Sequence, residues 1–126
     1  MWQDAFSIGV EHIDNQHKEL FAKTGELLDE LRANGMNNKD RCITTILFLK
    51  DYAIQHFADE EAYQISINYS GFAEHKKLHT QFLQDVLAFE QKMIDSDFAE
   101  TVVKKFADWL VAWLLYHVVD ADKRIK

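Results

Sequence analysis

Six histidines and a few carboxylates carry the most informative chemistry in this sequence. The stretch His56-x-x-x-Glu60 places an imidazole and a carboxylate one helical turn apart, and His75-x-x-x-His79 does the same with two imidazoles. Such pairs can bind a metal ion, but each alone is common on a solvated helix face. Whether they form one site depends on the elements that position them.

Few residues in the chain interrupt helices, since it has no proline and only four glycines. Apolar residues recur at spacings of three and four through most of it, which predicts helices. Breaks are expected at the Asn/Gly-rich stretch 34–38, at 68–71 and at 95–97. Residues Met1 to Ile13 are expected to form a non-helical arm. The predicted helices run from Asp14 to Ala33, Lys39 to Ile67, Phe72 to Ile94 and Asp97 to Val119, with Asp14 and Asp97 as N-caps.

Short connections make successive helices antiparallel neighbours, so we expect an all-α, up-down-up-down four-helix bundle in a single domain, residues 1–126. In an antiparallel hairpin, two residues lie at the same height when the turn falls midway between them. The midpoint of His17 and His56 falls in the first break. The midpoint of the two i, i+4 pairs falls within a residue of the second break, and that of His79 and His117 within a residue of the third. The histidines expected at one level are His17, His56, His75, His79 and His117.

The predicted cluster has the composition of a two-metal site. Imidazole suits zinc, copper, iron and nickel, and five imidazoles exceed what one tetrahedral zinc can use. Glu60 could bridge two metals, and the HVVDAD stretch that contains His117 offers Asp120 or Asp122 as a second bridge. These lie about 60° and about 140° from His117 around a helix, so geometry leaves the choice open. The competing interpretation, a metal-free core, would leave several buried ring nitrogens without partners.

Composition narrows the possible partners. A net charge of −7 and a pI near 5.3 argue against nucleic acid and anionic membranes. The most apolar stretch, Phe106 to Val119, is too short for a membrane span, and the start of the chain lacks the basic region of a signal peptide. The single Cys42 excludes a disulfide framework and any Cys-based metal site. We therefore expect a soluble protein in the reducing cytoplasm.

Four segments resemble the ligand segments of the hemerythrins, specifically the bacterial single-domain hemerythrins. The resemblance covers nearly the whole chain. The segments are GVEHIDNQHKELF (Gly9 to Phe21), FLKDYAIQHFADEE (Phe48 to Glu61), HKKLHTQF (His75 to Phe82) and WLLYHVVDAD (Trp113 to Asp122). The chain departs from the family pattern at Gln64, where the family usually has Met, and at Tyr69-Ser70, where it often has Tyr-Pro.

The resemblance implies a four-helix bundle that holds two non-haem iron ions bridged by a solvent-derived oxygen. The family pattern places an Asp five residues after the last His, which implies Asp122 as the second bridge and leaves Asp120 as the fallback. Dioxygen would bind reversibly, as hydroperoxide, at the iron that has two histidines. The implied iron ligands are His17, His56, Glu60, His75, His79, His117 and Asp122.

The implied function is oxygen storage, delivery or buffering without enzymatic turnover. The alternatives are a di-iron oxidoreductase acting on peroxide or nitric oxide and an oxygen- or redox-sensing module; the sequence identifies no protein partner. Candidates for a dry wall around dioxygen are Phe21, Phe57, Trp113 and Leu114. Trp2 and Phe6 are expected to cover the open end, His12 to lie on the surface, and Cys42 to contribute only packing.

Overall fold

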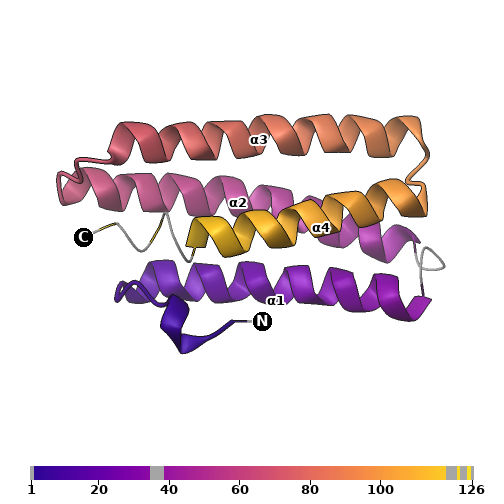
Figure 1. Ribbon diagram of the computed structural model, residues 1–126, viewed down its shortest axis with the longest axis horizontal. Helices are drawn as coiled ribbons and strands as arrows, with labels where there is room; N and C mark the ends of the chain where they lie inside the picture. The colour runs from indigo at the N-terminus through magenta and orange to yellow at the C-terminus, as the bar shows by residue number, and fades with distance from the viewer. Residues whose placement is uncertain (1, 35–38, 119–121, 123–124, 126) are drawn as a thin grey trace.

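The computed structural model describes residues 2–34, 39–118, 122 and 125. Its helices are the short 3₁₀ helix η1 (Asp4–Phe6) and the α-helices α1 (Glu11–Asn34), α2 (Lys39–Ser66), α3 (Phe72–Asp95) and α4 (Glu100–Tyr116). The four long helices lie side by side along one axis (Figure 1), and α1 packs on α2 and α4 while α3 packs on the same two helices. The predicted four-helix bundle is confirmed.

One apolar face of each long helix forms the core. The buried residues recur at the predicted spacings of three and four, because those positions share one face of a helix. Phe21, Phe57, Phe82 and Phe106 are buried rings of this core, each at most 3% exposed. The same faces carry the histidines, so the packing that stabilises the bundle also turns the imidazoles inward. Buried core positions on α2, α3 and α4 include Ile46, Leu49, Ala53, Val86, Val103, Leu110 and Leu114.

The start of α1 differs from the prediction. The helix begins at Glu11, so Asp14 is not its N-cap and residues 11–13 are not part of a non-helical arm. Asp14 instead reaches back to the preceding loop, where its carboxylate accepts hydrogen bonds from Ser7 Oγ at 2.6 Å and from the backbone N–H groups of Ile8 at 2.9 Å and Gly9 at 3.2 Å. These contacts hold the loop against the helix, and η1 adds a further short helical turn to the arm.

The start of α4 also differs. The helix begins at Glu100, three residues after the predicted N-cap Asp97. Asp97 and Phe98 have positive φ angles of 52° and 56°, which place them in the turn before the helix. The Asp97 carboxylate pairs with Lys39 Nζ at 2.6 Å instead of capping. The Ser96 hydroxyl accepts the Ala99 N–H at 3.3 Å, so a different side chain closes this turn.

The N-terminal arm packs against the first helix, and its expected covering of the open end of the bundle stays a prediction. The rings of Trp2 and Phe6 lie 6.0 and 5.7 Å from the ring of Phe21, which is one turn beyond His17. The aromatic arm thus covers this part of α1. Within residues 2–34 and 39–118, no helix is both long and apolar enough to cross a lipid bilayer.

Candidate metal centre

Seven buried side chains from helices α1, α2 and α3 and from the segment after α4 meet at one level of the bundle. Helix α1 supplies one histidine, α2 a histidine and a glutamate, and α3 two histidines, while the fifth histidine and an aspartate follow α4. Each is at most 3% exposed. The residues are His17, His56, Glu60, His75, His79, His117 and Asp122. The common level inferred from the three breaks is therefore present in the structure.

The seven side chains fall into two overlapping groups, and within each group the candidate ligand atoms all lie within 4.8 Å of one another. Glu60 and Asp122 belong to both groups. One group adds three histidines (His75, His79, His117) to these two carboxylates, and the other adds two (His17, His56). Two carboxylates shared by two histidine groups are the donor set expected for a pair of bridged metal ions.

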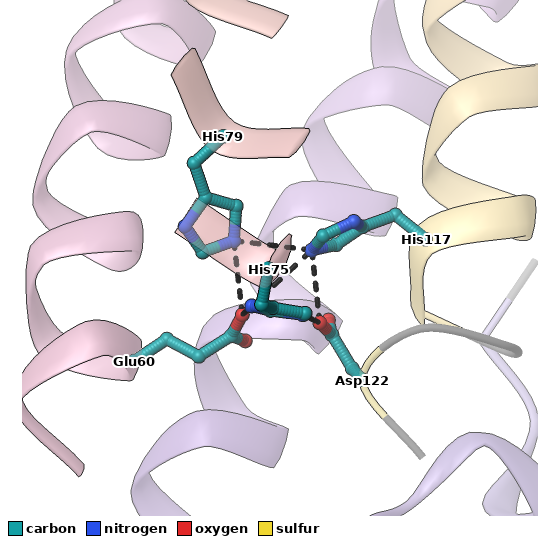
Figure 2. A group of neighbouring side chains, drawn as sticks. All are labelled: Glu60, His75, His79, His117 and Asp122. Atoms are coloured by element: carbon teal, nitrogen blue, oxygen red, sulfur yellow. Dashed lines mark hydrogen bonds and ion pairs between the residues drawn. The ribbon is translucent and has the colours of Figure 1, made fainter. Parts of the chain in front are cut away.

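In the three-histidine group the imidazoles turn their Nε2 atoms toward the two carboxylates (Figure 2). Asp122 Oδ1 lies 2.6 Å from His75 Nε2 and 2.8 Å from His117 Nε2. Glu60 Oε1 lies 3.1 Å from His79 Nε2, and the Nε2 atoms of His79 and His117 are also 3.1 Å apart. Two ring nitrogens this close can share a proton or face a common cation.

In the two-histidine group the other oxygen of each carboxylate faces the remaining imidazoles. Glu60 Oε2 lies 3.3 Å from the Nε2 atoms of both His17 and His56, and Asp122 Oδ2 lies 2.9 Å from His17 Nε2. The rings of His17 and His56 are 4.6 Å apart at 70°. Each carboxylate thus directs one oxygen to each group, as a bridging ligand does.

Unpaired polar atoms within the cluster test whether the residues fit a cation. His17 Nε2, Glu60 Oε2 and Asp122 Oδ2 are all buried, and among the described residues none of these atoms makes a hydrogen bond of acceptable geometry despite the short distances between them. Buried polar atoms without partners are costly, by about 1–3 kcal/mol each. Because imidazole and carboxylate suit iron, a cation among these atoms would remove that cost. The residues fit the metal.

Asp122 reaches the centre because α4 stops before it. Helix α4 ends at Tyr116, and the His117 N–H still bonds the carbonyls of Trp113 and Leu114, while His117 and Val118 continue as a wider π-type turn. A regular helix would hold Asp122 about 140° away from His117. The change of direction leaves it 0% exposed between the histidines. Asp120, the fallback for this position, lies outside the described residues.

Charge balance in the metal-free cluster favours ionised carboxylates and two protonated histidines. Burial lowers the pKa of His17 and His117, but the close negative charges of Asp122 and Glu60 outweigh it and raise both to about 9. The same contacts hold the pKa of Glu60 and of Asp122 below the usual range, against the opposing effect of burial. Burial lowers the pKa of His56, which leaves it a neutral imidazole at pH 7.

Three of the five histidines have an outer partner on their other ring nitrogen, as metal-binding histidines usually do. His56 Nδ1 lies 2.7 Å from Gln16 Oε1, His79 Nδ1 lies 2.9 Å from Glu61 Oε2, and His75 Nδ1 lies 2.6 Å from Gln64 Nε2. These partners were not anticipated as such. Gln64, one turn after Glu60, and Glu61, beside it, lie next to predicted ligands, but only helix packing reveals which ring each one meets.

Aromatic rings cover the core side of the centre. Phe57 stacks on His79 with centroids 4.0 Å apart and planes 11° apart, and Trp113 stacks on His117 at 4.3 Å and 13°. Both rings line an apolar cavity of about 20 Å³, and so does Leu114. Phe21, the fourth predicted wall residue, is buried but packs with Trp2 and Phe6 under the arm. Contact of dioxygen with these four side chains stays a prediction.

Two residues expected to have no role at the site lie outside the cluster. His12 is 70% exposed at its side chain, although its Nε2 lies 3.3 Å from Asp59 Oδ2 at the edge of the bundle. Cys42 is buried among core residues near the start of α2. Burial raises the pKa of its thiol, so it remains uncharged and serves packing.

Comparison with known proteins agrees with this geometry. Residues 8–126 match the hemerythrin HHE cation binding domain. The bacteriohemerythrin of Clostridium acetobutylicum is 33% identical over 124 residues, which are 98% of this chain and 95% of that protein. The myohemerythrin of Riftia pachyptila is 27% identical over 126 residues, covering 100% of this chain and 90% of the relative. The chain therefore belongs to the hemerythrin HHE cation-binding domain family.

Proposed function

We propose that this protein binds dioxygen reversibly at a pair of iron ions and acts as an oxygen store, carrier or buffer. The observation that carries the proposal is the enclosed centre in which two histidine groups share both carboxylates. The names of its relatives, bacteriohemerythrin and myohemerythrin, support the same assignment. A bound pair of ferrous ions can supply two electrons to dioxygen and recover them on release.

The two groups of side chains would have different tasks. His75, His79 and His117 would hold one iron with a full set of protein donors, and His17 and His56 would hold the other with one donor fewer. Glu60 and Asp122 would join the two sites through their paired oxygens. Since the two-histidine side has fewer protein ligands, we propose that dioxygen binds there.

The surrounding side chains would keep water away from the centre. Phe57 and Trp113 stack on His79 and His117 of the three-histidine group, and an apolar cavity of about 20 Å³ lies behind these two rings in the core. The burial of all seven side chains of the cluster favours a carrier of a small ligand over an enzyme with a large substrate. A di-iron oxidoreductase acting on peroxide or nitric oxide is the alternative that the same burial admits.

The test is to load the protein with iron, reduce it anaerobically, admit oxygen, and follow iron content and the visible spectrum. We expect two irons per chain and an oxygen-dependent charge-transfer band that disappears under argon and returns with oxygen. Less than one iron per chain would contradict a di-iron centre. Irreversible conversion to ferric protein at the first exposure would favour the oxidoreductase.

Two matched variants connect the result to the site. His17→Ala should abolish the oxygen-dependent band, because it removes one of the two histidines on the open side. His12→Ala, five residues earlier on the same helix but 70% exposed, should leave the band in place. Equal loss in both variants would refute the assignment of the open side.

A further inference from the structure

Gln16 links a buried histidine of the centre to an acidic residue at the edge of the bundle. It lies on α1 directly before His17 and is 7% exposed. Its Oε1 lies 2.7 Å from His56 Nδ1, and its Nε2 lies 2.7 Å from Asp59 Oδ2. The side-chain amide of Gln16 therefore connects His56, the histidine of α2 that faces the centre, to Asp59, a carboxylate one turn further along the same helix.

The carboxylate determines which way the amide points. An ionised Asp59 can only accept hydrogen bonds, and here it accepts from Gln16 Nε2 and, on its other oxygen, from Gln55 Nε2 at 2.9 Å. The NH₂ group of Gln16 must therefore face Asp59. Its carbonyl oxygen is left to face His56, and an oxygen can only accept.

The amide orientation in turn determines the tautomer of His56. An acceptor at 2.7 Å requires the proton on Nδ1, so the lone pair of the neutral ring is on Nε2. That atom points into the two-histidine group, 3.3 Å from Glu60 Oε2. We propose that Asp59 and Gln16 act as a positioning pair that presents His56 Nε2, ready for a metal ion, to the two-histidine site.

The other histidines of the centre are held differently. On the three-histidine side, Glu61 Oε2 lies 2.9 Å from His79 Nδ1 and accepts from it directly, with no amide between them. Gln64 meets His75 Nδ1 through its Nε2 instead of its Oε1, and that Oε1 has no hydrogen-bond partner among the described residues, so no carboxylate fixes this amide. His17 Nδ1 also lacks a hydrogen-bond partner within the part of the chain that the structure describes. In the two-histidine group, only His56 has its ligand atom selected by the protein before a metal arrives. The inference rests on the proposed two-metal site, and its test separates the two claims.

Zinc titration of the metal-free chain measures both sites without redox chemistry. Asp59→Leu removes the acceptor and frees the Gln16 amide to turn, so we expect the second zinc to bind about 10–100-fold more weakly, as is typical when an outer partner of a metal ligand is lost. The first zinc should be unaffected, which also reports that the bundle is folded. Asp85→Leu is the matched control, since Asp85 accepts a similar Gln81 amide at 2.9 Å on α3 but contacts no histidine.

A swapped pair distinguishes positioning from general support of the structure. In Gln16→Glu/Asp59→Asn the residue at 16 becomes a carboxylate, which can only accept and so needs no anchor, while the amide at 59 can donate to it. We expect this double variant to restore the second zinc site. ¹⁵N NMR of the metal-free wild type should show the His56 proton on Nδ1.

The outcomes separate the claims. Fewer than two zinc ions on the wild-type chain would overturn the two-metal site itself. Two zinc ions bound equally well by wild type and Asp59→Leu would overturn the positioning pair alone. A proton on His56 Nε2 in the metal-free wild type would overturn it as well, and so would a swapped pair that remains as weak as Asp59→Leu.

Discussion

The metal-free protein should lose stability as the pH rises from 6.5 to 8.5. His17 and His117 have pKa values raised from 6.5 to about 9, because Glu60 and Asp122 favour their protonated forms more than burial disfavours them. A raised pKa in the folded state contributes stability that is fully present below the unfolded value and is lost as the pH approaches the folded value. Both histidines therefore predict a falling free energy of unfolding across this interval.

The size of the loss follows from the shift. A group with pKa 6.5 unfolded and about 9 folded contributes roughly 3 kcal/mol at pH 6.5 and about 1 kcal/mol at pH 8.5, a loss of about 2 kcal/mol. The two histidines share the same two carboxylates, so their losses are not added. For a domain of this size the expected fall in Tm is about 5–10 °C. The upper limit of pH 8.5 avoids the thiol of Cys42, whose raised pKa adds a separate loss at higher pH.

Thermal melts followed by circular dichroism, on protein stripped with a chelator, measure the effect. Zinc-loaded protein is one control, because a metal that holds the histidines unprotonated removes their titration. The second control is His12→Gln, which removes an exposed histidine and should keep the full pH dependence. A Tm of the metal-free protein that stays constant or rises from pH 6.5 to 8.5 would refute the reasoning.

Three further substitutions test the surroundings of the centre. Asp14→Ala removes the acceptor of three hydrogen bonds from the loop before α1, so the free energy of unfolding measured by chemical denaturation should fall by about 2 kcal/mol and proteolysis at the arm should be faster. Unchanged stability would mean that the loop is held by its aromatic contacts alone. Phe57→Ala should lower the free energy of unfolding by about 3–5 kcal/mol, because it leaves a cavity, and should hasten oxidation of the iron-loaded protein in air. Phe48→Ala, which removes an exposed ring on the same helix, is its control, and equal oxidation rates in the two variants would argue against a dry wall. Gln64→Leu removes the partner of His75 but also a buried oxygen that is unpaired among the described residues, so the free energy of unfolding should change by less than about 1 kcal/mol while metal affinity falls about tenfold. An unaltered metal affinity would show that the amide has no effect on His75.

Much of the centre could be predicted because its residues obey local rules. Helical periodicity identified the buried faces, and the midpoints between histidines matched the breaks between helices. These two regularities brought His17, His56, Glu60, His75, His79 and His117 to one level, where the structure has them. The choice of Asp122 over Asp120 required the resemblance to hemerythrins, because a regular helix favours neither residue.

The predictions that failed concern the ends of helices. Asp14 and Asp97 are residue types that often cap helices, yet each bonds a group outside its own helix instead: the loop at residues 7–9 and Lys39. The energy of one cap is small, so a competing tertiary contact can move a helix end by a turn. The pattern of residues alone contains no information on which contact wins.

Packing between helices also determines which residues of the site contact one another across the bundle. The Gln16 amide meets Asp59, 43 positions away, and His75 meets Asp122, 47 positions away. Such pairings depend on the rotation of each helix and on the turn after Tyr116, neither of which a spacing of three or four reveals. The spacing of histidines and breaks was sufficient to place the metal-facing side chains at one level, because helices in a bundle repeat at a known rise. The orientation of each ring nitrogen toward a metal depended on contacts between helices, and only the tertiary structure shows them.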